Sequence, residues 1–135
     1  MNINYLIKLY FGTLTVFLGI DAVWLAKIAP GFYKANIGHL LAEKPNLAAA
    51  GIFYLLNIAG LLFFAVVPAL NNNSAKAALI SGALYGLFTY ATYDLTNLAT
   101  LKDWPLKVTI VDILWGMTLS ALVSLSGFYI GRWIR

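Results

Sequence analysis

The sequence predicts an all-α integral membrane protein whose 135 residues form a single domain, a four-helix transmembrane bundle. Hydrophobic residues make up 61% of the chain and charged residues only 10%, whereas an ordinary soluble domain carries roughly 25% charged residues. Four apolar runs each exceed the roughly 20 residues that a helix needs to cross a bilayer. The runs are continuous, which excludes a transmembrane β-barrel, because barrel strands alternate polar and apolar residues over about ten positions.

The first two runs, Tyr5–Ala29 and Leu47–Leu70, are the first two expected spans. Tyr5–Ala29 has some features of a signal peptide. However, it is too long, it contains Asp21 and Lys27, and no convincing small-residue cleavage site follows it. We therefore expect this run to be retained as a transmembrane helix.

Turn-forming residues delimit the last two expected spans, Ala75–Leu101 and Leu106–Trp133. A run of three asparagines ends at Ser74, whose side chain is expected to cap the third helix. The next connection is Asp103–Pro105. Its proline suits the first turn of a helix, because the N–H that proline lacks would be unpaired there in any case.

The longest connection, Pro30–Asn46, is expected to contain a short amphipathic helix. Its apolar residues recur at helical spacing, opposite Lys34 and Glu43. A helix of this kind lies in the membrane interface, with its apolar side buried among the headgroups. The apolar positions are Tyr33, Ile37, Leu40 and Leu41.

The charge and the lack of cysteine restrict the classes of function. Basic residues beside membrane spans anchor them at the headgroups, so the net charge of +4 indicates a lipid bilayer as the partner and not nucleic acid. A chain without cysteine forms no disulfide and has no catalytic thiol or thiolate metal site. Lysine and arginine divide four against five between the two sides, so the positive-inside rule gives no orientation. We expect cytoplasmic termini, because Arg132 and Arg135 closely flank the last span.

Three aspartates, Asp21, Asp94 and Asp112, lie inside the apolar runs with no lysine or arginine at their depth. An ionised carboxylate at the centre of a bilayer costs about 2.5–3.5 kcal/mol even on the lenient insertion scale. From the rise of an α-helix, all three lie roughly 10–13 Å below the same side of the membrane, and Asn57 lies roughly 16 Å from that side. Every expected helix thus brings a polar group to one half of the bilayer.

Small and polar residues form a stripe along each of the last two expected helices, which indicates that both stripes face the bundle interior. Small residues let helices approach closely in lipid, and polar side chains form hydrogen bonds across the seam. The stripes bring Asp94 and Asp112 together, so we predict a polar, aromatic-lined cavity that opens towards the long first connection. In chain order the four lines are Thr13, Phe17, Asp21 and Trp24; Phe53, Asn57, Gly60 and Phe64; Gly82, Gly86, Tyr90, Asp94 and Asn97; and Thr109, Asp112, Gly116, Ser120, Ser124 and Gly127.

A five-residue pattern occurs twice, as Ile20–Trp24 and Val111–Trp115. Each copy has an aliphatic residue, an aspartate, two apolar residues and a tryptophan. A tryptophan three residues after an aspartate lies on the same helix face, with its indole N–H near the carboxylate. Five positions are too few to establish an inverted repeat, and chance similarity accounts for the pattern equally well.

The cavity favours binding or transport of a proton, a small cation or another small polar molecule. Carboxylates supply negative charge, aromatic rings supply cation–π faces, and neighbouring carboxylates titrate as a unit, as is typical of functional sites. No cofactor is expected. The candidate ligand-binding residues are Asp21, Trp24, Asn57, Tyr90, Tyr93, Asp94, Asn97, Asp112 and Trp115.

Three alternatives remain open. Protonated aspartates could serve only as interhelical hydrogen-bonding groups, each contributing about 0.6 kcal/mol. The chain could be a structural or assembly subunit, or a homo-oligomer, that associates through the stripe with Gly82 and Gly86 or through the helix in the first connection. Finally, Asp94 and Asp112 could share a proton and activate water, as in an aspartate-dyad hydrolase. Catalysis is the less favoured interpretation, because the surrounding residues match neither intramembrane aspartyl proteases nor lipoprotein signal peptidases.

His39 is the only histidine and lies in the first connection. It could gate the cavity or sense pH, although a single histidine in a loop is more often simply solvated. A metal held by the three aspartates with Asn57 or Asn97 would have only oxygen ligands, which suits Mg²⁺, Mn²⁺ or Ca²⁺. Nothing in the spacing requires a metal.

Five segments carry specific motifs: Phe17–Leu25, Gly38–Ala42, Tyr90–Leu101, Trp104–Lys107 and Asp112–Gly116. They resemble the motifs of a bacterial membrane-protein family catalogued as domain of unknown function 2177, and the resemblance covers essentially the whole chain. The resemblance implies a four-helix protein of the bacterial inner membrane and supplies no activity. The motif positions include Asp21, Trp24, His39, Asp94, Asn97, Asp112 and Trp115.

Overall fold

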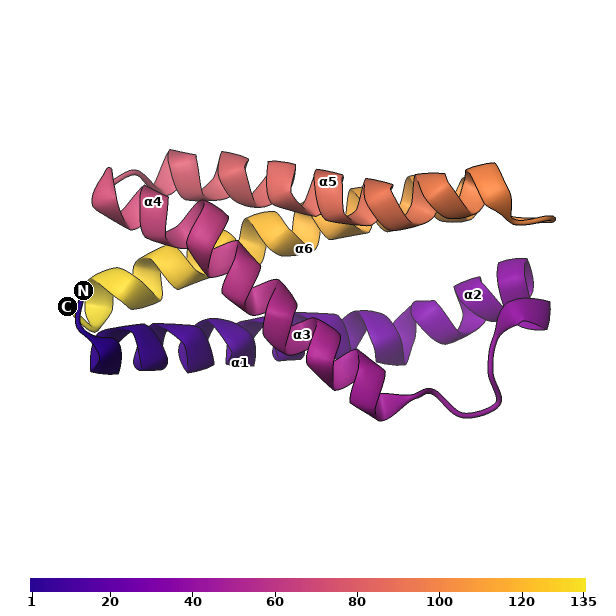
Figure 1. The fold of residues 1–135 in the computed structure, drawn as a ribbon, viewed down its shortest axis with the longest axis horizontal. Coiled ribbons are helices and arrows are strands. Elements are labelled where there is room, and N and C mark those ends of the chain that lie inside the picture. Colours follow the sequence, from indigo (N-terminus) through magenta and orange to yellow (C-terminus); the bar gives the residue numbers. More distant parts are fainter.

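A computed structural model describes all 135 residues as a long bundle of helices joined by short turns (Figure 1). The all-α fold predicted from the sequence is confirmed, and the helix bounds agree with the expected spans to within two residues. The three helices that run most of the length of the bundle are α1 (Ile3–Lys27), α5 (Ala75–Thr100) and α6 (Leu106–Trp133). Ser74 caps α5 as expected, since its hydroxyl oxygen accepts the Ala77 N–H at 3.1 Å.

A fourth long helix is wound unevenly. It begins as α3 (Leu47–Leu61), passes through a π-helical turn (Leu62–Val66) and ends as α4 (Val67–Asn71). The wide turn ends shortly before Pro68, which has no N–H to offer the carbonyl group one turn back. The buried residues of this helix recur every four positions. Phe64 falls outside these buried rows and is 65% exposed, although a regular helix would place it on the same face as Asn57.

The connection after α1 is only partly helical. A bend at Ile28 leads into α2 (Ala29–Ile37), a single 3₁₀ turn covers Gly38–Leu40, and the chain up to Asn46 is irregular. The predicted amphipathic helix is therefore shorter than expected, because glycine is a poor helix former and Gly38 follows the last α-helical residue. Leu40 and Leu41 are about half exposed. The position of α2 in the membrane interface stays a prediction.

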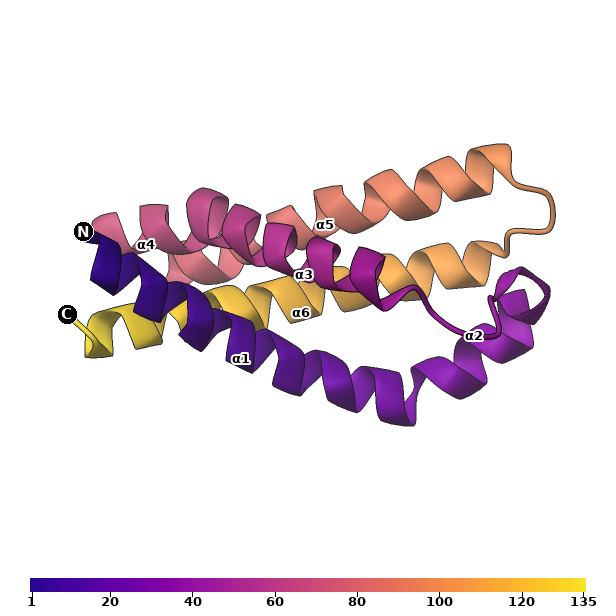
Figure 2. The same cartoon turned by 60° about the horizontal axis from the view of Figure 1, so that its bottom comes forward.

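Figures 1 and 2 show both termini at one end of the bundle and the α2–α3 and α5–α6 connections at the other. In both views α5 and α6 lie side by side and antiparallel, and they share the most extensive contact in the molecule. In Figure 1, α3 crosses the bundle diagonally and meets α5 closely only near the π-helical turn and α4. The far half of α3 therefore diverges from α5.

Two glycines allow the close approach of α5 and α6. A Cβ atom on Gly82 would lie 2.6 Å from the carbonyl oxygen of Ser120, and one on Gly86 would lie 2.6 Å from the carbonyl carbon of Gly116. Both Cβ atoms would point at backbone atoms of α6, which can move only if the helix moves with them. These two glycines of the predicted stripe thus lie in the contact between α5 and α6 of the same chain.

The main hydrophobic core fills the half of the bundle nearest the termini. Thirteen buried apolar residues from α1, the α3–α4 helix, α5 and α6 form it, with Phe17, Val66 and Phe128 among them. All five acidic residues of the sequence lie towards the other end: Asp21, Glu43, Asp94, Asp103 and Asp112. The buried acids therefore lie next to the solid core and not within it.

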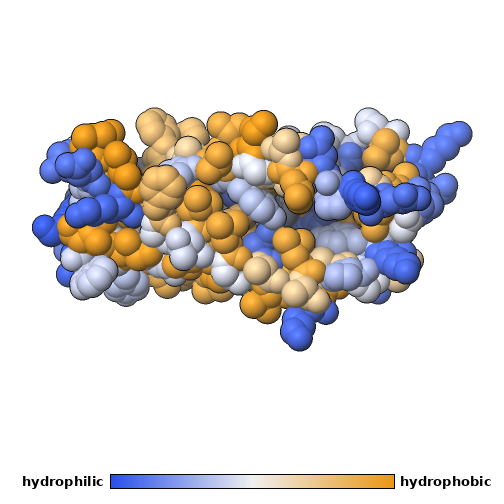
Figure 3. All heavy atoms as spheres, turned by 90° about the horizontal axis from the view of Figure 1, so that it is seen from below, coloured by the Kyte–Doolittle hydropathy of each residue, from blue (hydrophilic) through white to orange (hydrophobic).

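Three helices are long and apolar enough to cross a membrane: α1, the continuous helix Leu47–Asn71, and α6. α5 has 26 residues, a comparable length, but a less apolar composition, so its crossing stays a prediction. Figure 3 shows hydrophilic atoms gathered at the two ends of the bundle and a mainly apolar band between them. This distribution indicates a lipid bilayer around the middle of the bundle.

Candidate functional site

The carboxyl groups of Asp94 on α5 and Asp112 on α6 face each other across the seam, within hydrogen-bonding reach. Asp94 is completely buried and Asp112 is 7% exposed. Neither oxygen of Asp94 has a hydrogen-bond partner among neutral or cationic groups. Two carboxyl groups can hydrogen-bond to each other only when at least one is protonated, so the two form a coupled pair.

A pocket of about 370 Å³ adjoins this pair. Both acids line it, together with Phe53 from α3 and Tyr90 from α5. A Cβ atom on Gly116 would overlap the Tyr90 ring, so this glycine provides the space in which the ring lies against α6. The remaining lining residues are Thr89 and Tyr93, both from α5.

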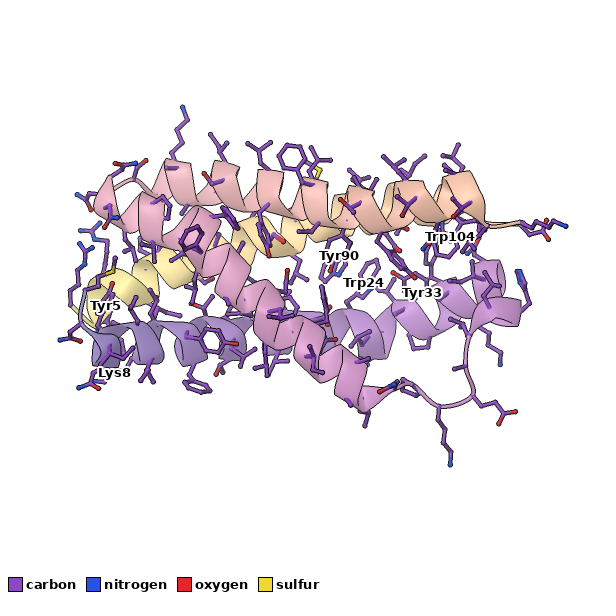
Figure 4. The ribbon with its side chains drawn as sticks, viewed as in Figure 1. Tyr5, Lys8, Trp24, Tyr33, Tyr90 and Trp104 are labelled. Atoms are coloured by element: carbon purple, nitrogen blue, oxygen red, sulfur yellow. The ribbon has the colours of Figure 1, made fainter.

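Asp112 has a partner that sequence reasoning missed. The Tyr33 hydroxyl of α2 donates a hydrogen bond of 2.5 Å to Asp112 Oδ1. Burial raises the pKa of the Tyr33 phenol above its ordinary value of 10.0. The hydrogen bond to Asp112 and the negative charge of Asp112 raise this pKa further. In Figure 4, Tyr33 lies near Trp24, and the Trp24 indole faces its hydroxyl oxygen.

Asp21 stands apart from this pair. Its Oδ2 accepts a 2.7 Å hydrogen bond from the hydroxyl of Tyr54 on α3, a second partner that the sequence analysis did not find. Tyr90 lies close enough to all three aspartates for their charges to act on its hydroxyl group. No three acidic or histidine side chains converge on one point that could hold a metal ion, so an oxygen-rich metal site does not form around the three aspartates.

The two copies of the five-residue pattern meet at their tryptophans. Trp24 of α1 and Trp115 of α6 stack with ring centroids 4.4 Å apart and an angle of 9° between their planes. Neither indole N–H donates a hydrogen bond to the aspartate of its own helix in this structure, and the ring faces contact each other. The stack fixes α1 against α6 beside the carboxyl pair.

Buried groups around Trp104 hold the end of the seam together. The Trp104 indole N–H donates a 3.0 Å hydrogen bond to the hydroxyl of Thr109, and this hydroxyl faces the backbone carbonyl of Asp94 at 3.4 Å. Trp104 also packs with Ile37 of α2 and Val108 of α6 in a small buried cluster. The backbone of Asp94 is thereby fixed, while its carboxyl group has no partner besides Asp112.

The remaining candidate residues lie at the margin of the site or outside it. Asn57 is buried, but its backbone carbonyl accepts a hydrogen bond from the Tyr85 hydroxyl, and it does not line the pocket. Asn97 is half-buried, and Tyr93 is 60% exposed at the edge of the pocket. His39 is exposed in the 3₁₀ turn.

The cavity does not open in the expected direction. The sequence pattern predicts an opening towards the first connection, yet the lining residues of the pocket come from α3, α5 and α6 and none from residues 28–46. The reason is that α2 continues beyond α1, bends towards α6 and places Tyr33 on Asp112 (Figure 2). A separate hollow of about 650 Å³ at the terminal end, lined by Tyr5, Lys8 and Arg135 among others, lies away from the acids (Figure 4).

Replacing Tyr33 by phenylalanine is expected to destabilise the protein by about 1.5–3 kcal/mol at neutral pH, because Asp112 loses its charged hydrogen bond. The raised pKa sets the sign of the pH dependence. The folded protein keeps the phenol proton, whereas the unfolded chain releases it near pH 10, so the stabilisation is complete below pH 10 and declines above it. The difference in denaturation midpoint between wild type and Tyr33→Phe should therefore shrink above pH 10.

The tyrosinate absorbance of the wild type minus that of Tyr33→Phe checks the same assignment. The difference should stay flat through pH 10 and rise only at higher pH. A difference spectrum that titrates at or below pH 10 would show that Tyr33 is not held by Asp112.

Comparison with known proteins gives one family. Neither the curated proteins nor the solved structures contain a significant match to this chain. The family described as predicted membrane protein (DUF2177) matches residues 6–129, which is nearly the whole chain and confirms the resemblance seen in the motifs. The chain therefore belongs to this family of predicted membrane proteins.

Proposed function

We propose that this protein binds a small organic cation inside the membrane, in the pocket beside Asp94 and Asp112. The observation that carries the proposal is Asp94, a fully buried carboxyl group that lines a pocket and has no partner for either oxygen other than a second acid. An unpaired polar group in an apolar interior costs several kcal/mol unless a ligand or a proton satisfies it. A bound cation supplies that partner.

The charge of the site fits a single positive group. No lysine or arginine lines the pocket beside Asp94 and Asp112. Because the two carboxyl groups are coupled, either one shared proton or one bound monocation leaves the pair with a single negative charge. Proton and cation therefore compete for the same place.

The walls of the pocket fit an organic cation better than a hydrated metal ion. Phe53, Tyr90 and Tyr93 line it, and aromatic faces attract ammonium groups that have lost their water. The volume of about 370 Å³ lies near the lower end of the 300–1,000 Å³ that small-molecule sites span, in order of magnitude. A ligand with few heavy atoms in its head group is expected.

The proposal includes the placement of the chain in the membrane. α5 packs along the length of α6 and carries Asp94, so we infer that α5 crosses as a fourth span despite its lower hydropathy. Both termini then share one side, which we assign to the cytoplasm of a bacterial cell with the protein in its inner membrane. A flux measurement decides whether the bound cation is also carried across.

Binding of tetramethylammonium to the full chain in lipid nanodiscs tests the proposal. This ion keeps its charge at every pH, and the Trp24–Trp115 stack close to Asp112 provides a fluorescence signal. Affinity should fall by up to about tenfold for each unit that the pH is lowered once protons occupy the carboxyl pair. Binding that is unchanged between pH 8 and pH 5 would contradict the proposal.

Two controls accompany this titration. The neutral alcohol tert-butanol, of similar size, should not bind. Asp103→Asn, which neutralises an exposed acid in the α5–α6 connection, should bind the ion like the wild type. Flux of labelled tetramethylammonium into proteoliposomes then separates transport from binding alone.

A further inference from the structure

We infer that the ligand enters the Asp94–Asp112 pocket sideways from the lipid, between α3 and α5, and is therefore an amphipathic ammonium compound with an alkyl chain. This inference rests on the proposed function, because it identifies the kind of cation that the same pocket receives. Two features of the structure support it: the pocket is covered towards the end of the bundle, and it is bordered by exposed apolar side chains on its flank.

The route from the end of the bundle is covered by α2. Tyr33 is hydrogen-bonded to Asp112 at 2.5 Å. Beyond it, Ile37 and Trp104 are 7% and 8% exposed and Val108 is completely buried, so an apolar plug lies between the carboxyl pair and the water at this end. A hydrated ion following this route would have to break the Tyr33 hydrogen bond and displace the plug.

The flank between α3 and α5 lacks such a cover. The diverging half of α3 makes no extensive contact with α5 (Figure 1). Phe53 of this half lines the pocket together with residues of α5 and α6. At its edge Phe53 is 47% exposed and Tyr93 is 60% exposed, and Phe88 on the same helix as Tyr93 is 66% exposed. Figure 4 shows Tyr90, Trp24 and Tyr33 between α5 and the α1–α2 arm, beside the diverging part of α3.

The surroundings of that flank determine the ligand class. Phe53 and Tyr93 are exposed, and the middle of the bundle is mainly apolar on the face shown in Figure 3, so we infer that lipid chains contact these two rings. A solute that reaches the carboxyl pair from there must dissolve in the bilayer, and it must carry a positive group for the acids. An alkylammonium compound meets both conditions, with its head group at Asp94 and its chain along the exposed rings.

Single cysteines test the route directly, because the chain has no cysteine of its own. Phe53→Cys at the flank should react in proteoliposomes with a lipid-soluble maleimide and not with a charged, membrane-impermeant thiosulfonate. Decyltrimethylammonium at about ten times its Kd should slow the maleimide reaction about tenfold, since roughly one site in eleven is then free. Leu114→Cys, exposed on α6 on the side facing away from Asp112, should react with the maleimide at an unchanged rate.

A second reporter guards against a folding defect in the first. Tyr93→Cys lies on the opposite side of the same opening and should show the same protection. Affinity, expressed per bilayer concentration, should be at least about tenfold higher for decyltrimethylammonium than for tetramethylammonium, because only the former places an alkyl chain on the apolar flank.

The outcomes separate the two proposals. If the impermeant reagent modifies both cysteines, or if both ammonium ions bind equally at matched bilayer concentration, entry from the lipid is wrong while a cation site remains. If neither ion binds in a manner that depends on Asp94, the proposed function itself is wrong. Protection of Phe53→Cys and Tyr93→Cys, but not of Leu114→Cys, is the result that supports entry from the lipid.

Discussion

Asp94→Asn is expected to weaken binding of tetramethylammonium strongly and at the same time to make the folded protein more stable. Removing one partner of a buried charge pair costs about 2–5 kcal/mol of binding free energy, so the loss of affinity should be at least about 30-fold. The amide has nearly the shape of the carboxyl group. It carries no charge to be desolvated, and its NH₂ group can donate to Asp112. We expect the free energy of unfolding to rise by about 1–3 kcal/mol.

The expected loss of affinity and gain of stability make this substitution informative. Changing a residue that only holds helices together would lower the stability of the protein. Changing a residue that is kept for ligand binding can raise it. Thermal unfolding followed by circular dichroism and fluorescence titration with the ion measure the two quantities on one sample. Asp103→Asn is the matched control and should change neither. A less stable Asp94→Asn that still binds the ion would show that Asp94 has a structural role alone.

Gly86→Ala is expected to destabilise the fold more than either Tyr33→Phe or Asp94→Asn changes it. The added Cβ would lie 2.6 Å from the carbonyl carbon of Gly116 and 2.9 Å from the Cα of Met117, so the whole of α6 would have to move away. Overpacking of this kind costs about 1–3 kcal/mol and more when only backbone can yield, so we expect a loss of at least about 3 kcal/mol.

Gly19→Ala provides the matched control, because no atom lies within 4 Å of a Cβ placed there. Alanine is the better helix former by about 0.8–1.0 kcal/mol, so this variant should be equal to the wild type or slightly more stable. Detergent unfolding followed by circular dichroism measures both. Equal stability of the two variants would mean that α5 and α6 are not in close contact at Gly86.

The sequence predicts the helices and the carboxyl pair because both depend on local patterns. The length of the apolar runs sets the helix bounds, and glycines at spacings of three and four mark the faces on which α5 and α6 meet. Asp94 and Asp112 lie on those faces, so their meeting follows from the pairing of consecutive helices joined by a short turn.

The partners of Asp112 and Asp21 could not be predicted in this way. Tyr33 is 79 residues from Asp112 in sequence, and Tyr54 is 33 residues from Asp21, so each contact depends on which helices become neighbours and not on any local pattern. Tyr33 fits the apolar side of an amphipathic helix equally well. Its hydroxyl, which needs a partner when buried, was the available signal.

The π-helical turn allows the α3–α4 helix to lose one residue and keep the same buried face at both ends. Its buried residues fall in rows at every fourth position from Asn57 to Ala69 and from Ile58 to Leu70, whereas a regular helix repeats every 3.6 residues. The one wide turn absorbs the difference and keeps both ends of the helix in phase with the core. Deleting Phe63 would remove the surplus residue and leave about 11 residues between Ile58 and Leu70, close to three regular turns of 3.6 residues. The wide turn would then become an ordinary α-helical turn, and Ala69 and Leu70 would stay in the core.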